Sequence, residues 1–244
     1  MKKYYEIDGD GKVHLLRFST GQRVEHFFLM TVFIVLILTG FPQKYPFTEW
    51  ARFIISGFGG INMVRWIHRT AGVLMALEAV YHISYLLVNV FFRKSQPTML
   101  PVKKDITDAL DMMKYCLGAR RHPPEFDRYD YRQKFEYWGL FFGGLIMIFS
   151  GIILWYPIEV ANMLPGELIP AAKVAHSNEA LLALLVIIVW HIYGAHLNPD
   201  VFPIDKTIKT GKIDLKQALE EHPREVERLV KEGKVPEEFL KNNP

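Results

Sequence analysis

The sequence predicts an all-α integral membrane protein, a bundle of four transmembrane helices with cytoplasmic N- and C-terminal tails. Of its 244 residues, 50% are hydrophobic and 23% are charged, and the two classes are segregated along the chain. The stretches 27–38, 140–158 and 180–190 contain no charged residue. A buried helix of a soluble protein is seldom apolar on every face, whereas a bilayer core of roughly 30 Å requires about 20 such residues. The segregation therefore indicates membrane spans.

Four spans are predicted along the chain, and proline or glycine marks several of their ends. The predicted spans are 24–41, 64–92, 135–156 and 172–197. Gly40 and Pro42 are expected to stop the first span and Pro157 the third, because proline lacks the N–H that continues a helix. The second span is long enough to tilt or to project beyond the bilayer. Short amphipathic helices are expected at 47–57 and 105–117, too short to cross it.

The distribution of Lys and Arg predicts the orientation of these spans. Three segments are rich in them: 1–23 with five, 93–134 with ten and 198–244 with nine. The connection 42–63 carries only two, and 157–172 carries none. Cytoplasmic segments are enriched in Lys and Arg, so both tails and the middle connection are predicted to be cytoplasmic. The expected organisation is a tail at 1–23, a four-helix domain at 24–197 and a tail at 198–244.

Histidines occur in pairs on the second and fourth predicted spans. His68 and His82 are 14 residues apart, and His176 and His191 are 15 apart. An α-helix turns 100° and rises 1.5 Å per residue, so the members of each pair lie about 40° or 60° apart and about 21 or 23 Å along the axis. Each pair therefore occupies roughly one face, with one histidine near each membrane surface. Ionisable residues within a span are costly and usually serve a function.

Two matched levels of histidine favour haem as the ligand. Bis-histidine ligation of haem iron needs a histidine from each of two facing helices at equal depth, which His68 and His176 satisfy at the outer level. The inner level offers four candidates: His26, His82, His191 and His196. Spacing leaves both His26–His191 and His82–His191 open. Zinc is less favoured because it takes more ligands close together. The single cysteine excludes a disulfide, a protein-bound iron–sulfur cluster and a covalent c-type haem.

Four segments in order resemble the membrane cytochrome b (gamma) subunit of respiratory formate dehydrogenases, a family related to the cytochromes b of nickel–iron hydrogenases and thiosulfate reductases. They begin RVEHFFLM, MVRWIHRTAG, RYDYRQKF and AHSNEALL, and the resemblance covers about residues 20–200. It implies two haems b. The outer haem would be held by His68 and His176, and the inner haem by His26 and His191.

The resemblance also implies a menaquinone site on the cytoplasmic side, near RYDYRQK. Asp130 stands there where the family usually has Asn, and it is a candidate for quinone contact. The family pattern gives His82 no ligand role. His82 and His196 would then hold a third haem, or His196 caps the helix end while His82 bonds to a quinone or a haem propionate. Glu78 lies one turn before His82 and would form a proton route or pair between helices.

Three further expectations concern neighbours of the histidines. Arg69 is a candidate partner for haem propionates, with an interfacial anchor as the alternative. Glu179, one turn after His176, is expected to orient that imidazole or to reach water. His191 and His196 are five residues apart, about 140° around an α-helix, so they are not expected to face one haem together.

The sequence therefore predicts a multi-pass protein of the bacterial or archaeal cytoplasmic membrane, a b-type cytochrome with two or three haems. It would be the quinone-reactive electron-transfer subunit of a respiratory oxidoreductase complex. Electrons would pass between menaquinone or another quinone at the cytoplasmic side and a periplasmic iron–sulfur or multihaem cytochrome subunit. Lipid is an expected partner and nucleic acid is not. The alternatives are a stand-alone transmembrane haem reductase, which would purify alone, and a haem-free anchor or transporter, which would show no Soret band.

Overall fold

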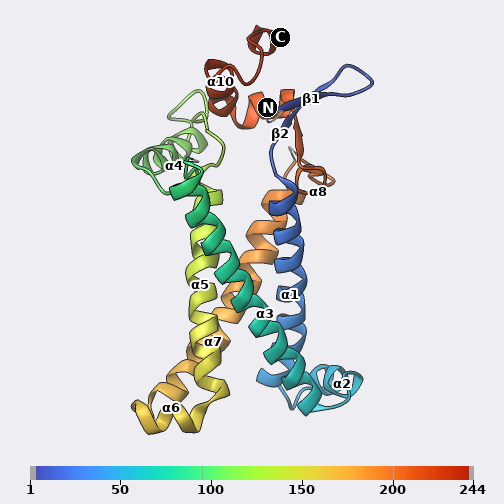
Figure 1. The fold of residues 1–244 in the computed structure, drawn as a ribbon, viewed down its shortest axis with the longest axis vertical. Helices are drawn as coiled ribbons and strands as arrows, with labels where there is room; N and C mark the ends of the chain where they lie inside the picture. The colour runs from blue at the N-terminus through green and yellow to red at the C-terminus, as the bar shows by residue number, and fades with distance from the viewer. Residues whose placement is uncertain (1–3, 95, 200, 242–244) are drawn as a thin grey trace. The chain divides into compact units, whose positions relative to one another are not determined.

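The computed structural model describes residues 4–94, 96–199 and 201–241, and within them four helical segments are long and apolar enough to cross a membrane (Figure 1). These are α1 (Thr20–Lys44), α3 (Ile61–Leu87) with η1 (Val88–Phe92), α5 (Tyr131–Trp155), and α7 (Leu168–Leu185) with η2 (Val186–His191) and η3 (Tyr193–Leu197). In the most apolar part of each span at most 11% of residues are buried inside the chain. Lipid or a partner must cover such a surface. The predicted all-α membrane class is confirmed.

Pro42 does not end the first span, contrary to the prediction. It lies inside α1, which continues to Lys44, and the backbone N–H of Tyr45 still donates to the carbonyl of Phe41 at 3.0 Å. The ring of proline fits helical backbone angles, and in the last turn it removes only one hydrogen bond. Membrane helices tolerate that loss.

The short helices agree with the prediction, with one addition. α2 (Glu49–Gly57) and α4 (Lys103–Cys116) occupy the two regions expected to hold amphipathic helices. α6 (Pro157–Met163) was not predicted, because Pro157 was interpreted only as the end of a span. Proline at the first position of a helix loses a hydrogen bond that would be missing anyway, so it begins α6 as readily as it ends α5.

The ends of the second and fourth spans are π-helical. In η1 the N–H of Arg93 donates to the carbonyl of Val88 at 3.2 Å, and at the end of η3 the N–H of Asn198 donates to Tyr193 at 2.9 Å. Both bonds join residues five apart, so each turn holds more residues than an α-helical turn. The 100° periodicity therefore does not place side chains beyond Val186. Such turns are frequent at functional sites.

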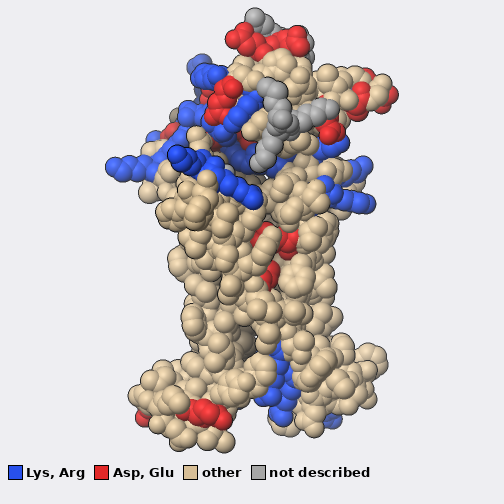
Figure 2. All heavy atoms as spheres, viewed as in Figure 1, with Lys and Arg blue, Asp and Glu red and all other residues tan. Residues whose placement is uncertain are grey.

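The chain divides into two compact units, which are described separately. The first consists of residues 1–23, 96–138 and 204–244, and the second of 24–95 and 139–203. Figure 2 shows Lys and Arg gathered on the first unit. The helices of the second unit show mostly uncharged side chains, with a few acidic groups part-way along and both basic and acidic groups near one end.

The first unit contains a small sheet that was not predicted. Its strands pair antiparallel in the order β1–β2–β3, with Leu15 opposite both Tyr5 and Ile213. They are β1 (Tyr5–Ile7), β2 (Val13–Leu16) and β3 (Lys212–Asp214). Short helices follow: α8 (Thr207–Thr210), α9 (Leu215–Glu221), α10 (Pro223–Lys231) and α11 (Glu238–Lys241). Leu15 and Ile213 pack with Val226 and Leu229 in a common apolar core, so both terminal segments fold together.

Candidate functional site

Two pairs of histidine rings lie close together in the second unit. The outer pair, named for the membrane side expected from the sequence, is His68 of α3 and His176 of α7, with ring centres 6.2 Å apart. The inner pair is His26 of α1 and His191 of η2, with ring centres 6.0 Å apart. Of the two inner pairings that spacing left open, the structure brings together His26 and His191.

The distance between the rings suits an ion held between them. A bond from an imidazole nitrogen to a transition-metal ion such as zinc is about 2.0–2.1 Å long, and the ring centre lies roughly 1 Å beyond the nitrogen. Two opposed ligands on one ion therefore have ring centres roughly 6 Å apart, whereas a direct hydrogen bond between rings would bring them to about 5 Å. Both observed pairs have the longer spacing. The donor sets fit bis-histidine haem ligation.

Hydroxyl groups lie against both rings of the outer pair. Thr39 Oγ1 of α1 is 3.0 Å from His68 Nδ1, and Ser150 Oγ of α5 is 3.0 Å from His176 Nδ1. The residue after each hydroxyl is glycine. Neither hydroxyl was singled out from the sequence. The available signal was a hydroxyl residue followed by glycine, once in the first span and once in the third.

Glycine lets each outer ring approach its neighbouring helix. A Cβ atom on Gly40 would lie 3.0 Å from His68 Cε1, and one on Gly151 would lie 3.3 Å from His176 Cε1. Real Cβ contacts are rarely that short, so the ring would have to shift. The close approach therefore depends on the absence of a side chain at these two positions.

Glu179 was expected to orient the imidazole of His176 or to reach water, and this stays a prediction. The ring contact that the structure shows is with the hydroxyl of Ser150. The Glu179 carboxylate packs against Gly143 of α5, where an added Cβ would collide with it.

Two histidines at the inner level have a ring nitrogen without a partner in the described part of the chain. His26 Nδ1 and His196 Nδ1 are buried, and neither has a hydrogen-bond partner among the described residues. His26 interacts electrostatically with both His191 and His196. In α-helical geometry these last two were expected about 140° apart, but π-helical turns stack residues five apart. Buried polar atoms without partners usually mark a place completed by a ligand or water.

His82 contacts acidic groups at this end of the second unit. Its Nδ1 hydrogen-bonds to the carboxylate of Glu25 of α1. One ligand atom each from Glu25, Glu78 and His82 lie within 4.8 Å of one another. The closeness of Glu78 and His82 follows from their spacing on one helix, whereas Glu25 was not singled out from the sequence. A third haem on His82 and His196 stays a prediction.

Asp130, in the first unit, has a structural use for both carboxylate oxygens. Its Oδ1 accepts from the N–H of Gln133 at 2.8 Å, and Gln133 Oε1 accepts from the N–H of Asp130 at 3.2 Å. This reciprocal pair is a capping box that satisfies N–H groups at the start of α5. Oδ2 accepts from Arg132 Nη2 at 2.6 Å, and Asp130 is 5% exposed. Its contact with a quinone stays a prediction.

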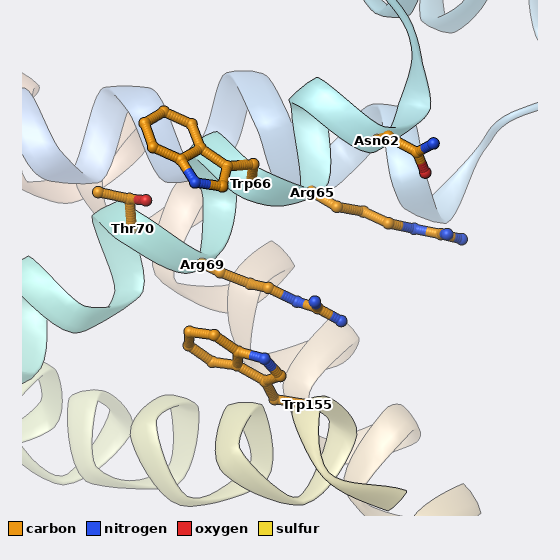
Figure 3. A pocket seen from close by; sticks show the side chains of 6 residues that line it. All are labelled: Asn62, Arg65, Trp66, Arg69, Thr70 and Trp155. Carbon is orange, nitrogen blue, oxygen red and sulfur yellow. The ribbon is translucent and has the colours of Figure 1, made fainter.

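Arg69 contributes to a pocket of about 420 Å³ near the start of α3. The lining residues are Asn62, Arg65, Trp66, Arg69, Thr70 and Trp155. Figure 3 shows Arg65 and Arg69 extending the same way from one helix, with Arg69 over Trp155 of α5, and the guanidinium carbon lies 5.1 Å from the indole centre. The pocket can attract an anionic group, and a contact between Arg69 and a haem propionate stays a prediction.

Comparison with known proteins finds that the chain is similar to membrane cytochromes. The family model described as prokaryotic cytochrome b561 matches residues 103–202. The cytochrome b556(Fdn) subunit of the nitrate-inducible formate dehydrogenase of Escherichia coli K12 is 22% identical over 205 residues, 83% of this chain and 85% of that protein. The formate dehydrogenase cytochrome b556 subunit of Haemophilus influenzae is 25% identical over 219 residues, 90% of this chain and 84% of that one.

A third relative, the formate dehydrogenase cytochrome b556(fdo) subunit of Escherichia coli K12, is 26% identical over 184 residues, covering 74% of this chain and 78% of that protein. The resemblance to membrane cytochrome b subunits of formate dehydrogenases is therefore confirmed. So is the prediction of a multi-pass protein of the prokaryotic cytoplasmic membrane, which rests on the same comparisons and on the four apolar spans.

Proposed function

We propose that this chain, a membrane cytochrome b protein related to the cytochrome b556 subunits of formate dehydrogenases, holds two haems b and conducts electrons across the membrane within a respiratory complex. One observation carries the proposal: in two histidine pairs from neighbouring spans, the ring centres lie 6.2 and 6.0 Å apart. His68 and His176 would hold the outer haem, and His26 and His191 the inner haem.

The separation of the two levels suits transfer across a bilayer. His176 and His191 lie on one continuous span, about 23 Å apart if the helix rises 1.5 Å per residue. The hydrocarbon core is roughly 30 Å thick, so one pair would lie toward each surface. Haem supplies the one-electron chemistry when bound, and the histidines hold its iron. Each charge that crosses exchanges about 2.3 kcal/mol per 100 mV with the membrane potential.

The orientation is proposed from charge. Lys and Arg are concentrated in the two tails and in the connection between the second and third spans, which favours a cytoplasmic location for these segments. The outer pair would then face the periplasm, where an iron–sulfur or multihaem cytochrome subunit would exchange electrons with it. The names of the formate dehydrogenase relatives support such an assembly.

A quinone, menaquinone or another, would react at the cytoplasmic side beside the inner pair. The buried Nδ1 atoms of His26 and His196, which lack partners in the described chain, and the carboxylates near His82 supply polar groups there. His82 and Glu78 are the candidates for quinone or proton contact in the second unit. Asp130, in the first unit, is a separate candidate.

Haem content tests the proposal directly. Pyridine haemochrome analysis of the purified chain is expected to give two haems b, falling to one in His68→Ala and in His26→Ala. His122→Ala, in an exposed connection of the first unit, serves as the matched control and should keep both. A wild-type chain without haem would refute the proposal. Three haems, falling to two in His82→Ala or His196→Ala, would extend it.

A further inference from the structure

We infer that Thr39 and Ser150 are positioning residues that set the tautomer and the orientation of the two outer histidines. The inference rests on the proposed haem function and assigns a role to side chains outside the ligand set. Each hydroxyl lies 3.0 Å from the Nδ1 atom of one ring of the outer pair, Thr39 at His68 and Ser150 at His176.

The hydroxyl protons determine the direction of these bonds. Thr39 Oγ1 donates to the carbonyl of Val35 at 2.6 Å, and Ser150 Oγ donates to the carbonyl of Ile146 at 2.5 Å. A hydroxyl has one proton, and a carbonyl can only accept, so that proton is already committed to the helix backbone. Toward the ring, the hydroxyl oxygen can therefore only accept.

The ring nitrogen that faces each hydroxyl must then carry the proton. A neutral imidazole protonated at Nδ1 has its lone pair on Nε2. Both rings of the outer pair are thus held in the tautomer whose Nε2 is ready to bind iron. Metal-ligating histidines usually donate the other ring N–H to a nearby acceptor, which fixes the ring and raises its basicity.

Burial strengthens the effect of each bond. Thr39 is 0% exposed and Ser150 is 5% exposed, so both hydroxyl groups are shielded from water. Hydrogen bonds in such surroundings are stronger than in water. Each ring is therefore expected to keep its orientation before and after haem binds.

The adjacent glycines complete the arrangement. Gly40 and Gly151 face the Cε1 atom of the ring that the preceding hydroxyl contacts, at 3.0 and 3.3 Å from an added Cβ. Cε1 lies between the two ring nitrogens, so the glycine allows the hydroxyl to reach Nδ1. The same hydroxyl–glycine pair serves His68 from α1 and His176 from α5. This recurrence on two separate helices favours a functional origin over accidental packing.

The inner pair provides an internal contrast. His26 Nδ1 has no hydrogen-bond partner in the described chain. Removing the hydroxyl of Thr39 or Ser150 should therefore change the outer haem and leave the inner haem unaltered. Loss of the acceptor makes the ligand less basic and less able to stabilise ferric iron, which should raise the midpoint potential of the outer haem.

The test uses Thr39→Val and Ser150→Ala in the full-length purified chain, with Thr31→Val and Ser84→Ala as matched controls. Thr31 and Ser84 make the same bond to the carbonyl four residues earlier, at 2.8 and 2.7 Å, but are exposed. Potentiometric titration of the Soret band and low-temperature EPR separate the two haems, and His68→Ala identifies the outer one.

Thr39→Val and Ser150→Ala should raise the outer potential, broaden the outer low-spin EPR signal and speed loss of the outer haem to apomyoglobin about 10-fold. The controls should match wild type. Thr39→Ser and Ser150→Thr keep a hydroxyl at each position, so they should keep the outer haem at its wild-type potential. If wild type holds two haems and the outer signals stay unchanged in both test variants, the inference is wrong. If wild type holds no haem, the proposed function fails and the inference with it.

Misfolding would show as loss of the inner haem too. If Thr39→Val misfolds in this way, Ser150→Ala, which removes only the side-chain oxygen, tests the inference at the His176 ring. Its outer potential should rise while the inner haem stays at the wild-type potential, and an unshifted outer potential would refute the inference.

Discussion

Arg17 and Glu225 come from opposite ends of the chain and form a buried ion pair, with Nη1 and Oε2 2.6 Å apart. Arg128, from the connection between the second and third spans, approaches the other carboxylate oxygen at 2.5 Å. Arg17 also lies 2.9 Å from His222 Nε2. One buried carboxylate thus joins three segments that the hydropathy pattern separates by membrane spans.

Breaking this ion pair is expected to destabilise the first unit strongly. Glu225→Gln would leave the guanidinium of Arg17 buried without its charged partner, and such losses typically cost about 3–5 kcal/mol. Lys231→Gln removes an exposed pair with Glu227 in the same helix and should change stability by less than about 1 kcal/mol. Protease cleavage of the C-terminal segment under increasing denaturant measures both. Equal resistance of the two variants would contradict the expectation.

His222 should make the first unit sensitive to acid. Burial, and secondly the neighbouring charge of Arg17, lower the pKa of this imidazole from 6.5 to about 4. The unfolded chain therefore binds the proton first, and stability is lost as the pH falls from about 6.5 toward 4, by up to about 3 kcal/mol. Above pH 7 this histidine should have no effect. Unfolding curves at several pH values should show a shallower acid loss in His222→Gln, and identical slopes would refute the assignment.

Substitutions at the glycines should affect the outer haem in a definite order. Gly40→Ala places a Cβ 3.0 Å from His68, Gly151→Ala places one 3.3 Å from His176, and Gly72→Ala meets nothing within 4 Å. Outer-haem content should fall most for Gly40→Ala, less for Gly151→Ala and not at all for Gly72→Ala. Haem per chain and the reduced-minus-oxidised spectrum measure this order. A loss in Gly72→Ala as large as in Gly40→Ala would show that helix substitution alone is responsible.

Glu25 should be needed for reaction with quinol and not for haem binding. Glu25→Gln keeps the size of the side chain and removes the charge beside His82. If this cluster passes protons at the inner level, reduction of haem by a menaquinol analogue should slow by at least about 100-fold, the lower end of the usual range for acid–base groups. Glu49→Gln, exposed in α2, is the control. Stopped-flow rates of haem reduction, compared between the variants and wild type at equal haem content, test this prediction. Unchanged rates in Glu25→Gln would show that the cluster is not part of the proton route.

The inner histidine pair shows how far spacing on one helix can be trusted. Spacing left His26 and His82 as alternatives to face His191, because periodicity describes one helix and not its rotation against a neighbour. In the structure α1 presents His26 to His191, while His82 meets Glu25. The family resemblance implied the same ligand pair. The π-helical turns that end at His191 and follow it change the direction in which side chains leave the helix, and no pattern in the sequence predicted these turns.

Thr39 and Ser150 illustrate a second limit. Serine and threonine are common within membrane helices because they can bond to their own backbone, as Thr31 and Ser84 do. Only the packing of α1 against α3 and of α5 against α7 distinguishes the two hydroxyls that also reach a histidine.

By itself the sequence determined the four spans, the two short helices α2 and α4, and the two levels of histidine. Each depends on local composition or on periodicity within one helix, and neither requires knowing which helices pack together. Tertiary structure alone decided the partner of His191, the hydroxyls that orient the outer rings, the carboxylate beside His82 and the sheet that joins both termini. Those features depend on contacts between segments far apart in the chain, such as Leu15 and Ile213, whose pairing no local pattern encodes.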